Sequence, residues 1–184
     1  MELENNIPGI KMVLNTTEFL VYESSTSFND LFNNVNETKS YSVISYSPYS
    51  NNNYHVNNND ELFSSLLNKD VVFHICTADR GVRQIHNFPN GNYTLGRHGT
   101  HNHTIPTDKL HIIWFGFYPM NENLLKRKLQ ISQNIPQSDK DTGNGIQHLY
   151  DKEKIMSINN EKVNTGSKLD ILNVKLYNLI QNMQ

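Results

Sequence analysis

Apolar and polar residues alternate along several stretches of the N-terminal two thirds of the chain, as in strands that bury one face. The predicted strands are Met12–Tyr22, Tyr41–Tyr46, Val71–Thr77, Val82–Phe88 and Leu110–Tyr118. In Val71–Thr77, alternate residues place Cys76 on the same face as Val72 and His74. The run Leu110–Tyr118 is apolar almost throughout, so we expect a central strand covered on both faces, with Trp114 in the core.

A tight hairpin turn is expected after the Val82–Phe88 strand. The segment Pro89–Asn92 contains an Asn-Gly pair, whose residues tolerate the positive φ angles of a two-residue turn. The stretches Ser47–Asp60 and Gln133–Gly145 are rich in Asn, Ser and Gly and are the best loop candidates.

A 3.6-residue periodicity predicts helices at Ser27–Val35, Asn59–Asn68 and Asn121–Leu129, the last with a Glu122–Lys126 pair. The clearest helix is the final one, which follows a capping-box pattern at Ser167–Asp170. Its apolar stripe consists of Leu169, Leu172, Leu176, Leu179 and Met183. This stripe favours a helix docked on the sheet, and a seam with a second copy is the alternative.

These elements predict an α+β, mainly β fold: a single-domain antiparallel sheet or sandwich with three or four short helices, including the amphipathic C-terminal helix. We expect one domain over residues 1–184, with a β-rich body at 1–132 and a loop plus helical tail at 133–184. The tail packs on the body or on another copy.

Composition narrows the classes of function. The chain has 184 residues, of which 36% are hydrophobic and 18% charged, and 28 are asparagines. A net charge of −2 with dispersed basic residues does not predict nucleic-acid binding. No stretch is long and apolar enough to span a bilayer, and the first residues do not resemble a secretory signal, so we expect a soluble, intracellular protein. The lone Cys76 excludes an intrachain disulfide and is expected to be buried and unreactive.

The segment Arg97–Thr104 concentrates three of the eight histidines, at His98, His101 and His103. Gly96, Gly99 and Pro106 favour a loop here instead of a strand. With Asp108, these histidines are candidate ligands for a divalent metal such as iron, zinc or manganese. An exposed cluster of histidines without a ligand is the alternative.

The pattern Gly96, His101, His103, Asp108 and Gly116 resembles the first metal-binding motif of cupins. The resemblance implies a metal held by the two histidines and the acid. It covers about 20 residues, its first spacer is one residue short, and Asp replaces the Glu of the family motif. The second cupin motif has only a loose counterpart around His148.

Three functions follow as hypotheses. The first is a non-enzymatic structural or interaction protein, which binds a protein partner or self-assembles through Tyr- and Asn-rich surfaces and the C-terminal helix. The second is a metal-binding protein or metal-dependent enzyme that uses His98, His101 and His103. The third is a metal-free hydrolase or nuclease that uses the same histidines with Arg97 as an anion clamp.

Overall fold

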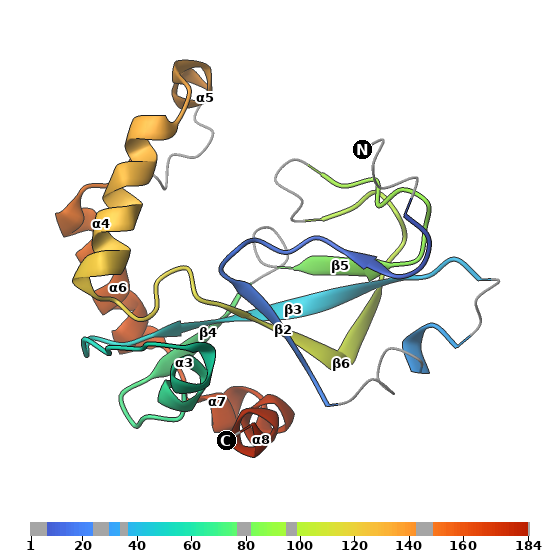
Figure 1. Ribbon diagram of the computed structural model, residues 1–184, viewed down its shortest axis with the longest axis horizontal. Helices are drawn as coiled ribbons and strands as arrows, with labels where there is room; N and C mark the ends of the chain where they lie inside the picture. The colour runs from blue at the N-terminus through green and yellow to red at the C-terminus, as the bar shows by residue number, and fades with distance from the viewer. Residues whose placement is uncertain are drawn as a thin grey trace. The chain divides into compact units, whose positions relative to one another are not determined.

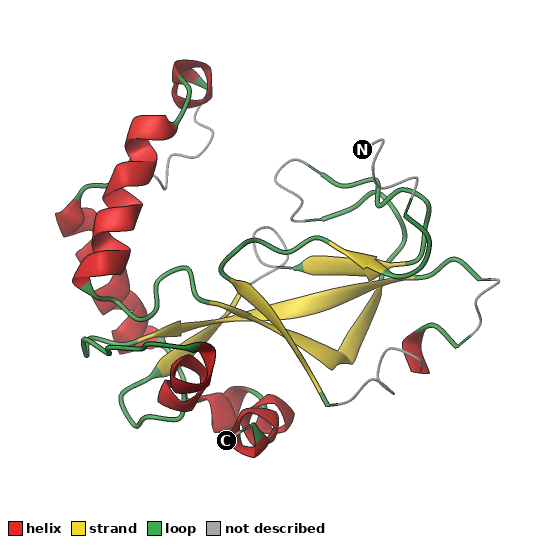
Figure 2. Ribbon diagram, in the orientation of Figure 1, coloured by secondary structure: helices red, strands yellow, loops and turns green. Residues whose placement is uncertain are grey.

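The computed structural model describes residues 7–23, 30–33, 37–76, 82–94, 99–142 and 149–183. Its strands are β1 (Lys11–Met12), β2 (Glu18–Tyr22), β3 (Ser40–Tyr49), β4 (Val72–Cys76), β5 (Arg83–His86) and β6 (Ile105–Trp114). Its helices are α3 (Asn59–Ser65), α4 (Glu122–Ile131), the 3-10 helix η2 (Ser132–Asn134), α5 (Gln137–Asp141), α6 (Lys152–Thr165), α7 (Leu169–Leu172) and α8 (Val174–Asn182). The α+β class with C-terminal helices, predicted from the sequence, is confirmed (Figures 1 and 2).

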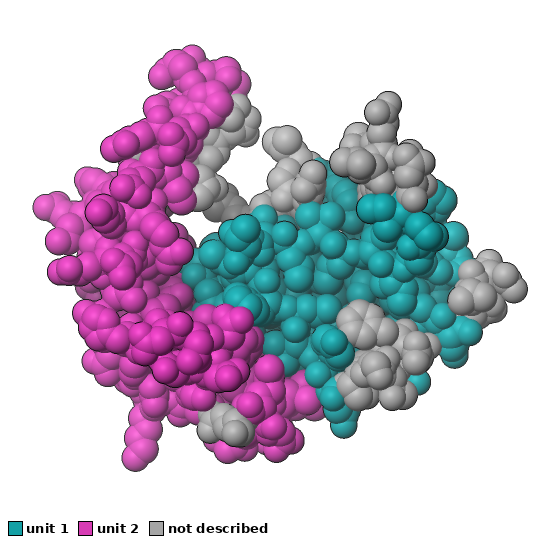
Figure 3. Space-filling model, in the orientation of Figure 1, with its two compact units in different colours: residues 1–47, 75–116 teal, residues 48–74, 117–184 magenta. Residues whose placement is uncertain are grey.

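The chain divides into two compact units, which are coloured separately in Figure 3. Unit 1 comprises Met1–Ser47 and Ile75–Gly116, and unit 2 comprises Pro48–His74 and Phe117–Gln184. The expectation of a single domain stays a prediction.

The sheet follows the strand order β1-β5-β3-β6-β2, and β4 also pairs with β3. The pairs β1–β5, β3–β5 and β2–β6 are antiparallel, whereas β3 and β6 run parallel. A register shift between Val43 and Ser45 interrupts the parallel pair. The sheet is therefore mixed, not antiparallel throughout. The side-chain period is two in both kinds of pairing, so alternation in the sequence does not distinguish them.

One face of the sheet carries the core of unit 1. Its buried residues are Leu31, Phe32, Val43, Ile85, Leu110 and Ile112. Partly buried Met12, Leu14, Leu20 and Tyr41 pack against them. The register explains this grouping, because Tyr41 lies opposite Ile85, and Leu20 lies opposite Ile112.

Unit 1 also contains a buried ion pair between β2 and β5. The Arg83 Nε donates to both carboxylate oxygens of Glu18, at 2.8 and 3.1 Å. The two side chains are only 3% and 5% exposed. The backbone N–H of Asn15 donates to Glu18 Oε2 at 2.8 Å, so the buried carboxylate accepts bonds from two residues.

Two strand predictions differ in their limits from the structure. Met12–Tyr22 is not one strand: β1 and β2 are separated by a turn in which Glu18 N–H donates to the Asn15 carbonyl at 3.0 Å. The strand predicted at Leu110–Tyr118 instead spans Ile105–Trp114. Its apolar half, from Leu110 to Ile113, is buried as expected.

The expected placements of Trp114 and Cys76 were wrong. Trp114 is half-buried, and its indole ring lies over the backbone of Gly116, where a Cβ atom would come within 2.3 Å of Cε2. The indole therefore packs against the backbone of Gly116 and stays partly exposed, instead of being enclosed in the core. Cys76 is also half-buried, because it ends β4 next to exposed Ile75.

The Asn90-Gly91 pair does not form the expected hairpin turn. Among the described residues, positive φ angles occur at Asn92 (49°) and at Gly9 (91°), and neither Asn90 nor Gly91 has one. Tyr93 instead forms an isolated bridge with Thr100, farther along the chain. The loop after β5 is therefore wider than a two-residue turn.

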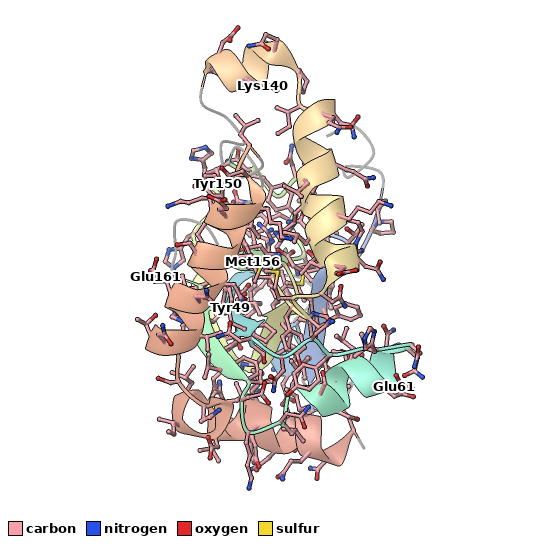
Figure 4. All side chains as sticks on the ribbon, turned by 90° about the vertical axis from the view of Figure 1, so that its left-hand side faces the viewer. Tyr49, Glu61, Lys140, Tyr150, Met156 and Glu161 are labelled. Carbon is pink, nitrogen blue, oxygen red and sulfur yellow. The ribbon has the colours of Figure 1, made fainter. Side chains whose placement is uncertain are left out.

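Unit 2 contains α4 and α6, which lie side by side (Figures 1 and 4). Buried Met120, Leu124 and Ile155 form its apolar cluster, against which Phe117, Leu125, Leu129, Tyr150 and Met156 pack. Figure 4 shows Met156 on the side of α6 that faces α4. No helix in the described ranges is long and apolar enough to cross a membrane.

The helices predicted at Asn59–Asn68 and Asn121–Leu129 are confirmed as α3 and α4. Of the helix predicted at Ser27–Val35, residues 30–33 are described: Asp30 and Leu31 are helical, and Leu31 and Phe32 are buried. The sequence did not predict α6. Asn159 occupies a fully buried position one turn after Ile155, and this polar residue interrupts the apolar periodicity.

The predicted C-terminal helix is divided in two at Asn173. This residue has an extended backbone, and its side-chain Oδ1 accepts a hydrogen bond from Leu176 N–H at 3.0 Å, as an N-cap of α8. Leu169, Leu176 and Ile180 are buried, and the docking of this stripe on the sheet or on a second copy stays a prediction. Met183 was expected in the stripe but is 56% exposed.

Candidate functional site

The predicted histidine site lies in unit 1, in the loop before β6. Residues 99–104 form a loop, as expected, and β6 begins at Ile105. His101 and His103 are exposed, and Asp108 is exposed within β6. Arg97 and His98 lie outside the described residues, as do Gly96 and His148, which the cupin resemblance includes.

Hydrogen bonds of the residues between the histidines explain why the histidines face outward. Thr100 Oγ1 donates to the Gly91 carbonyl at 2.6 Å. The Asn102 side chain donates to the Gly91 and Asn90 carbonyls at 3.2 and 3.3 Å. Because Thr100 and Asn102 hold the loop from the inside, the alternating His101 and His103 project to its surface.

The described residues contain no group of three or more His, Cys, Asp or Glu side chains close enough to share a metal ion. Metal binding through His101, His103, Asp108 and His98 therefore stays a prediction, since His98 is outside the described ranges. The same holds for the hydrolase or nuclease hypothesis, because its anion clamp, Arg97, is also outside them.

A polar hollow of about 430 Å³ lies beside α3 in unit 2. It is lined by Tyr54, His55, Val56, Asn58, Asp60, Glu61, Ser64, Ser65 and Asn68. Much of its polar lining already has partners within the chain. The Asn57 backbone and side chain both donate to Glu61, at 2.8 and 2.9 Å, and Asn58 caps α3. These bonds order the loop before α3.

The half-buried carboxylate of Asp70 anchors the same loop. Ser50 and Tyr54 both donate hydrogen bonds to Asp70. Burial favours a raised pKa for Asp70, but the hydrogen bonds from Ser50 and Tyr54, with the charge of Lys168, hold that pKa below its usual value. Burial and the bond to Asp70 raise the pKa of Tyr54. At neutral pH, Asp70 is therefore a carboxylate and Tyr54 a protonated phenol. Their hydrogen bond holds the loop in place.

A second hollow, of about 400 Å³, runs along α4 and reaches the first residue of α6. We call it the α4 groove, and it is lined by Glu122, Leu125, Lys126, Leu129, Gln130, Gln133 and Lys152. Residues 122, 126, 129 and 133 of this set recur at helical spacing, so they occupy one face of α4 and its continuation into η2. Leu125 and Leu129 are half-buried and form an apolar floor.

The rim of the α4 groove is charged and exposed. Lys126 and Lys152 contribute two cations and Glu122 one carboxylate. Within the part of the chain that the structure describes, neither lysine forms an ion pair. The Glu122–Lys126 pair expected from the sequence is thus not formed. An apolar floor beside exposed, unneutralised lysines is suited to an apolar ligand that carries negative charge.

Lys128 lies on a different face of α4 and is half-buried. Its Nζ atom is 3.7 Å from the centroid of the Phe117 ring. Phe117 in turn stacks on Tyr49, with ring centroids 5.8 Å apart. Burial, with the charge of Arg127, lowers the pKa of Lys128 to about 8. The sequence pattern did not single out this lysine, because its burial depends on Phe117, outside its own helix.

Comparisons with known proteins provide no assignment. No family model matches the chain, and neither a curated protein nor a solved structure is significantly similar to it.

Proposed function

We propose that this protein is a non-enzymatic interaction protein, and that its α4 groove binds an acidic, amphipathic segment of a protein partner. The observation that carries the proposal is the combination of Leu125 and Leu129 on the floor with Lys126 and Lys152 on the rim. An amphipathic helix laid in a groove buries apolar residues at i and i+3 or i+4, and its flanking side chains meet the rim.

The positive charge of Lys126 and Lys152 favours an acidic partner. Lys126 and Lys152 are exposed and form no ion pair with any residue that the structure describes, so they attract carboxylates without first breaking such a pair. Rim charges of this kind mainly accelerate association and exclude partners of like charge. Binding should therefore weaken as ionic strength rises.

The test uses a synthetic amphipathic helical peptide with Leu at i, i+4 and i+7 and Glu beside each Leu, labelled for fluorescence anisotropy. We expect saturable binding to the intact protein. A peptide of the same pattern with Lys in place of Glu should not bind. The double variant Lys126→Glu/Lys152→Glu should weaken binding of the acidic peptide by about tenfold or more, since each exposed ion pair contributes about 0.2–1 kcal/mol and reversal adds repulsion.

Lys154→Glu is the matched control, because Lys154 is exposed on α6 but does not line the groove. It should bind like the parent. Equal affinity for both peptides, or an unchanged affinity in the double variant, contradicts the proposal. Light scattering of the parent at the same concentration tests whether a second copy occupies the α4 groove. A mass above that of a monomer, which falls in the double variant, identifies a second copy as the occupant.

A further inference from the structure

The α4 groove suits a ligand with two features. Its floor, formed by Leu125 and Leu129, accepts apolar side chains, and Lys126 and Lys152 on its rim attract carboxylates. If a segment of this chain has both features and leaves its apolar side chains exposed, one copy of the protein can bind another through that segment.

The first ten residues of the chain, Met1–Ile10, have this composition, and we call them the N-terminal segment. It contains the carboxylates of Glu2 and Glu4 and no Lys or Arg. Its apolar residues Leu3 and Ile7 are four positions apart, which is a spacing proposed above for a ligand of the groove. The N-terminal segment therefore matches the α4 groove both in charge and in apolar pattern.

The described part of this segment, residues 7–10, does not pack on the rest of the chain that the structure describes. Ile7 and Ile10 are 55% and 43% exposed, and a Cβ atom on Gly9 would meet no atom within 4 Å. The next residue, Lys11, is fixed in β1, and its Nζ donates to two backbone carbonyls after β5 at 2.9 Å. The chain is thus anchored from Lys11 onward, and the two isoleucines before it are accessible to another molecule.

Other acidic or exposed apolar segments match the groove less well. Glu61 lies near the start of α3, but the apolar Phe63 of that helix is buried and cannot enter a groove. Ile171 is 75% exposed, but the segment 168–175 around it carries two lysines and one aspartate. Its net positive charge is repelled by the rim lysines.

We infer that the α4 groove of one copy binds the N-terminal segment of a second copy. The apolar side chains of the segment cover the floor of the groove, and its two carboxylates face the rim lysines. This inference rests on the proposed function, because it names the ligand of the same groove. The segment and the groove are different surfaces, so every copy carries both halves of the contact.

The first test uses the acetylated peptide Met1–Ile10, labelled at its C-terminal end, and measures its binding to the intact protein by fluorescence anisotropy. We expect saturable binding that weakens about tenfold or more in Lys126→Glu/Lys152→Glu and stays unchanged in Lys154→Glu. A peptide with Glu2→Lys/Glu4→Lys should show the opposite preference, because it should bind the double variant better than the parent protein.

A peptide with Ile7→Ser should bind the parent several-fold more weakly, because it loses an apolar contact with the floor. An unchanged affinity overturns the apolar part of the inference. If the designed acidic peptide binds the groove and Met1–Ile10 does not, this inference fails while the proposed function stands. If neither peptide binds, both fail.

The second test is light scattering of the full chain, at concentrations well above the dissociation constant of the peptide. The parent should associate, whereas Glu2→Lys/Glu4→Lys and Lys126→Glu/Lys152→Glu should each be monomeric. The chain that carries all four substitutions should associate again, because the segment and the rim then have opposite charges once more.

Glu23→Lys/Glu161→Lys is the matched control, because it changes the net charge as much as Glu2→Lys/Glu4→Lys does but at exposed acids outside the segment and the groove. This control should associate like the parent. A parent that stays monomeric, or a fourfold variant that does not recover association, overturns the inference.

Discussion

In unit 1, the stability of the buried ion pair between Glu18 and Arg83 depends on both residues being present. Removing one partner of a buried ion pair leaves an uncompensated charge, which costs about 3–5 kcal/mol. We therefore expect Glu18→Ala to lower the free energy of unfolding by about this amount, measured by urea denaturation. The matched control is Asp30→Asn, which breaks the exposed pair with Lys109 (52% and 42% exposed) and should change stability by less than about 1 kcal/mol. Equal effects of the two substitutions contradict the buried placement of Glu18.

A second prediction concerns the contact between Gly116 and Trp114. A Cβ atom at position 116 would lie 2.3 Å from both Cε2 and Cζ2 of the indole. Gly116→Ala should force the ring out of its site, destabilise the protein by about 1–3 kcal/mol and shift the Trp114 emission to longer wavelength. Gly99→Ala is the control, because its Cβ would meet Thr94 at an ordinary 3.4 Å. An unshifted emission spectrum in Gly116→Ala means that the ring does not cover this glycine.

The loop and the alternative of an exposed histidine cluster were predictable from the sequence, but the contacts that fix these side chains were not. The sequence singled out His101 and His103 correctly as loop residues, yet their outward projection depends on Thr100 and Asn102 bonding to carbonyls near Gly91. Lys128 was not noticed, because the ring that covers its amine comes from Phe117, which precedes α4. Contacts between segments decided these cases, and local patterns do not contain them.

Among the elements, α7 and α8 show how one side chain divides a predicted helix. Asn173 caps α8 through its Oδ1, and replacing an Asn cap by Ala costs about 0.5–2 kcal/mol. We expect Asn173→Ala to lower stability by about 1 kcal/mol, and helix content by circular dichroism to stay equal or rise as α7 and α8 join. Asn173→Asp keeps an acceptor at the cap and should retain most of the stability. If Asp and Ala have the same effect, the cap contributes nothing.

The existence of most elements could be predicted from periodicity, but their limits and pairing could not. Strong stripes identified α3, α4 and the C-terminal helices, whereas α6 was missed because Asn159 occupies a buried position and donates to Ser50 O at 3.1 Å. The parallel pairing of β3 and β6 depends on the path of the chain between them, which alternation does not encode.

At the scale of the whole molecule, the metal prediction is tested by elemental analysis. If the histidines bind a divalent metal, the purified protein contains that metal in stoichiometric amount. The double variant His101→Asn/His103→Asn then lacks the metal, and its free energy of unfolding falls because the stabilisation from metal binding is lost. His55→Asn serves as the control, because His55 is exposed in unit 2. Metal content that is absent in the parent or unchanged in the double variant removes this site.

The strand order separates the synthesis of the N-terminal strands from the synthesis of their partners. Lys11 pairs with His86, and Glu18 pairs with Trp114, so early strands wait for partners that are made much later. At a translation rate of about 5–20 residues per second, β2 remains without β6 for roughly 5–20 s. During that interval Phe19, Leu20 and Val21 have no sheet to cover them, and such non-local pairing also slows refolding. A nascent chain of this kind depends on being kept from aggregation until residue 114 has left the ribosome.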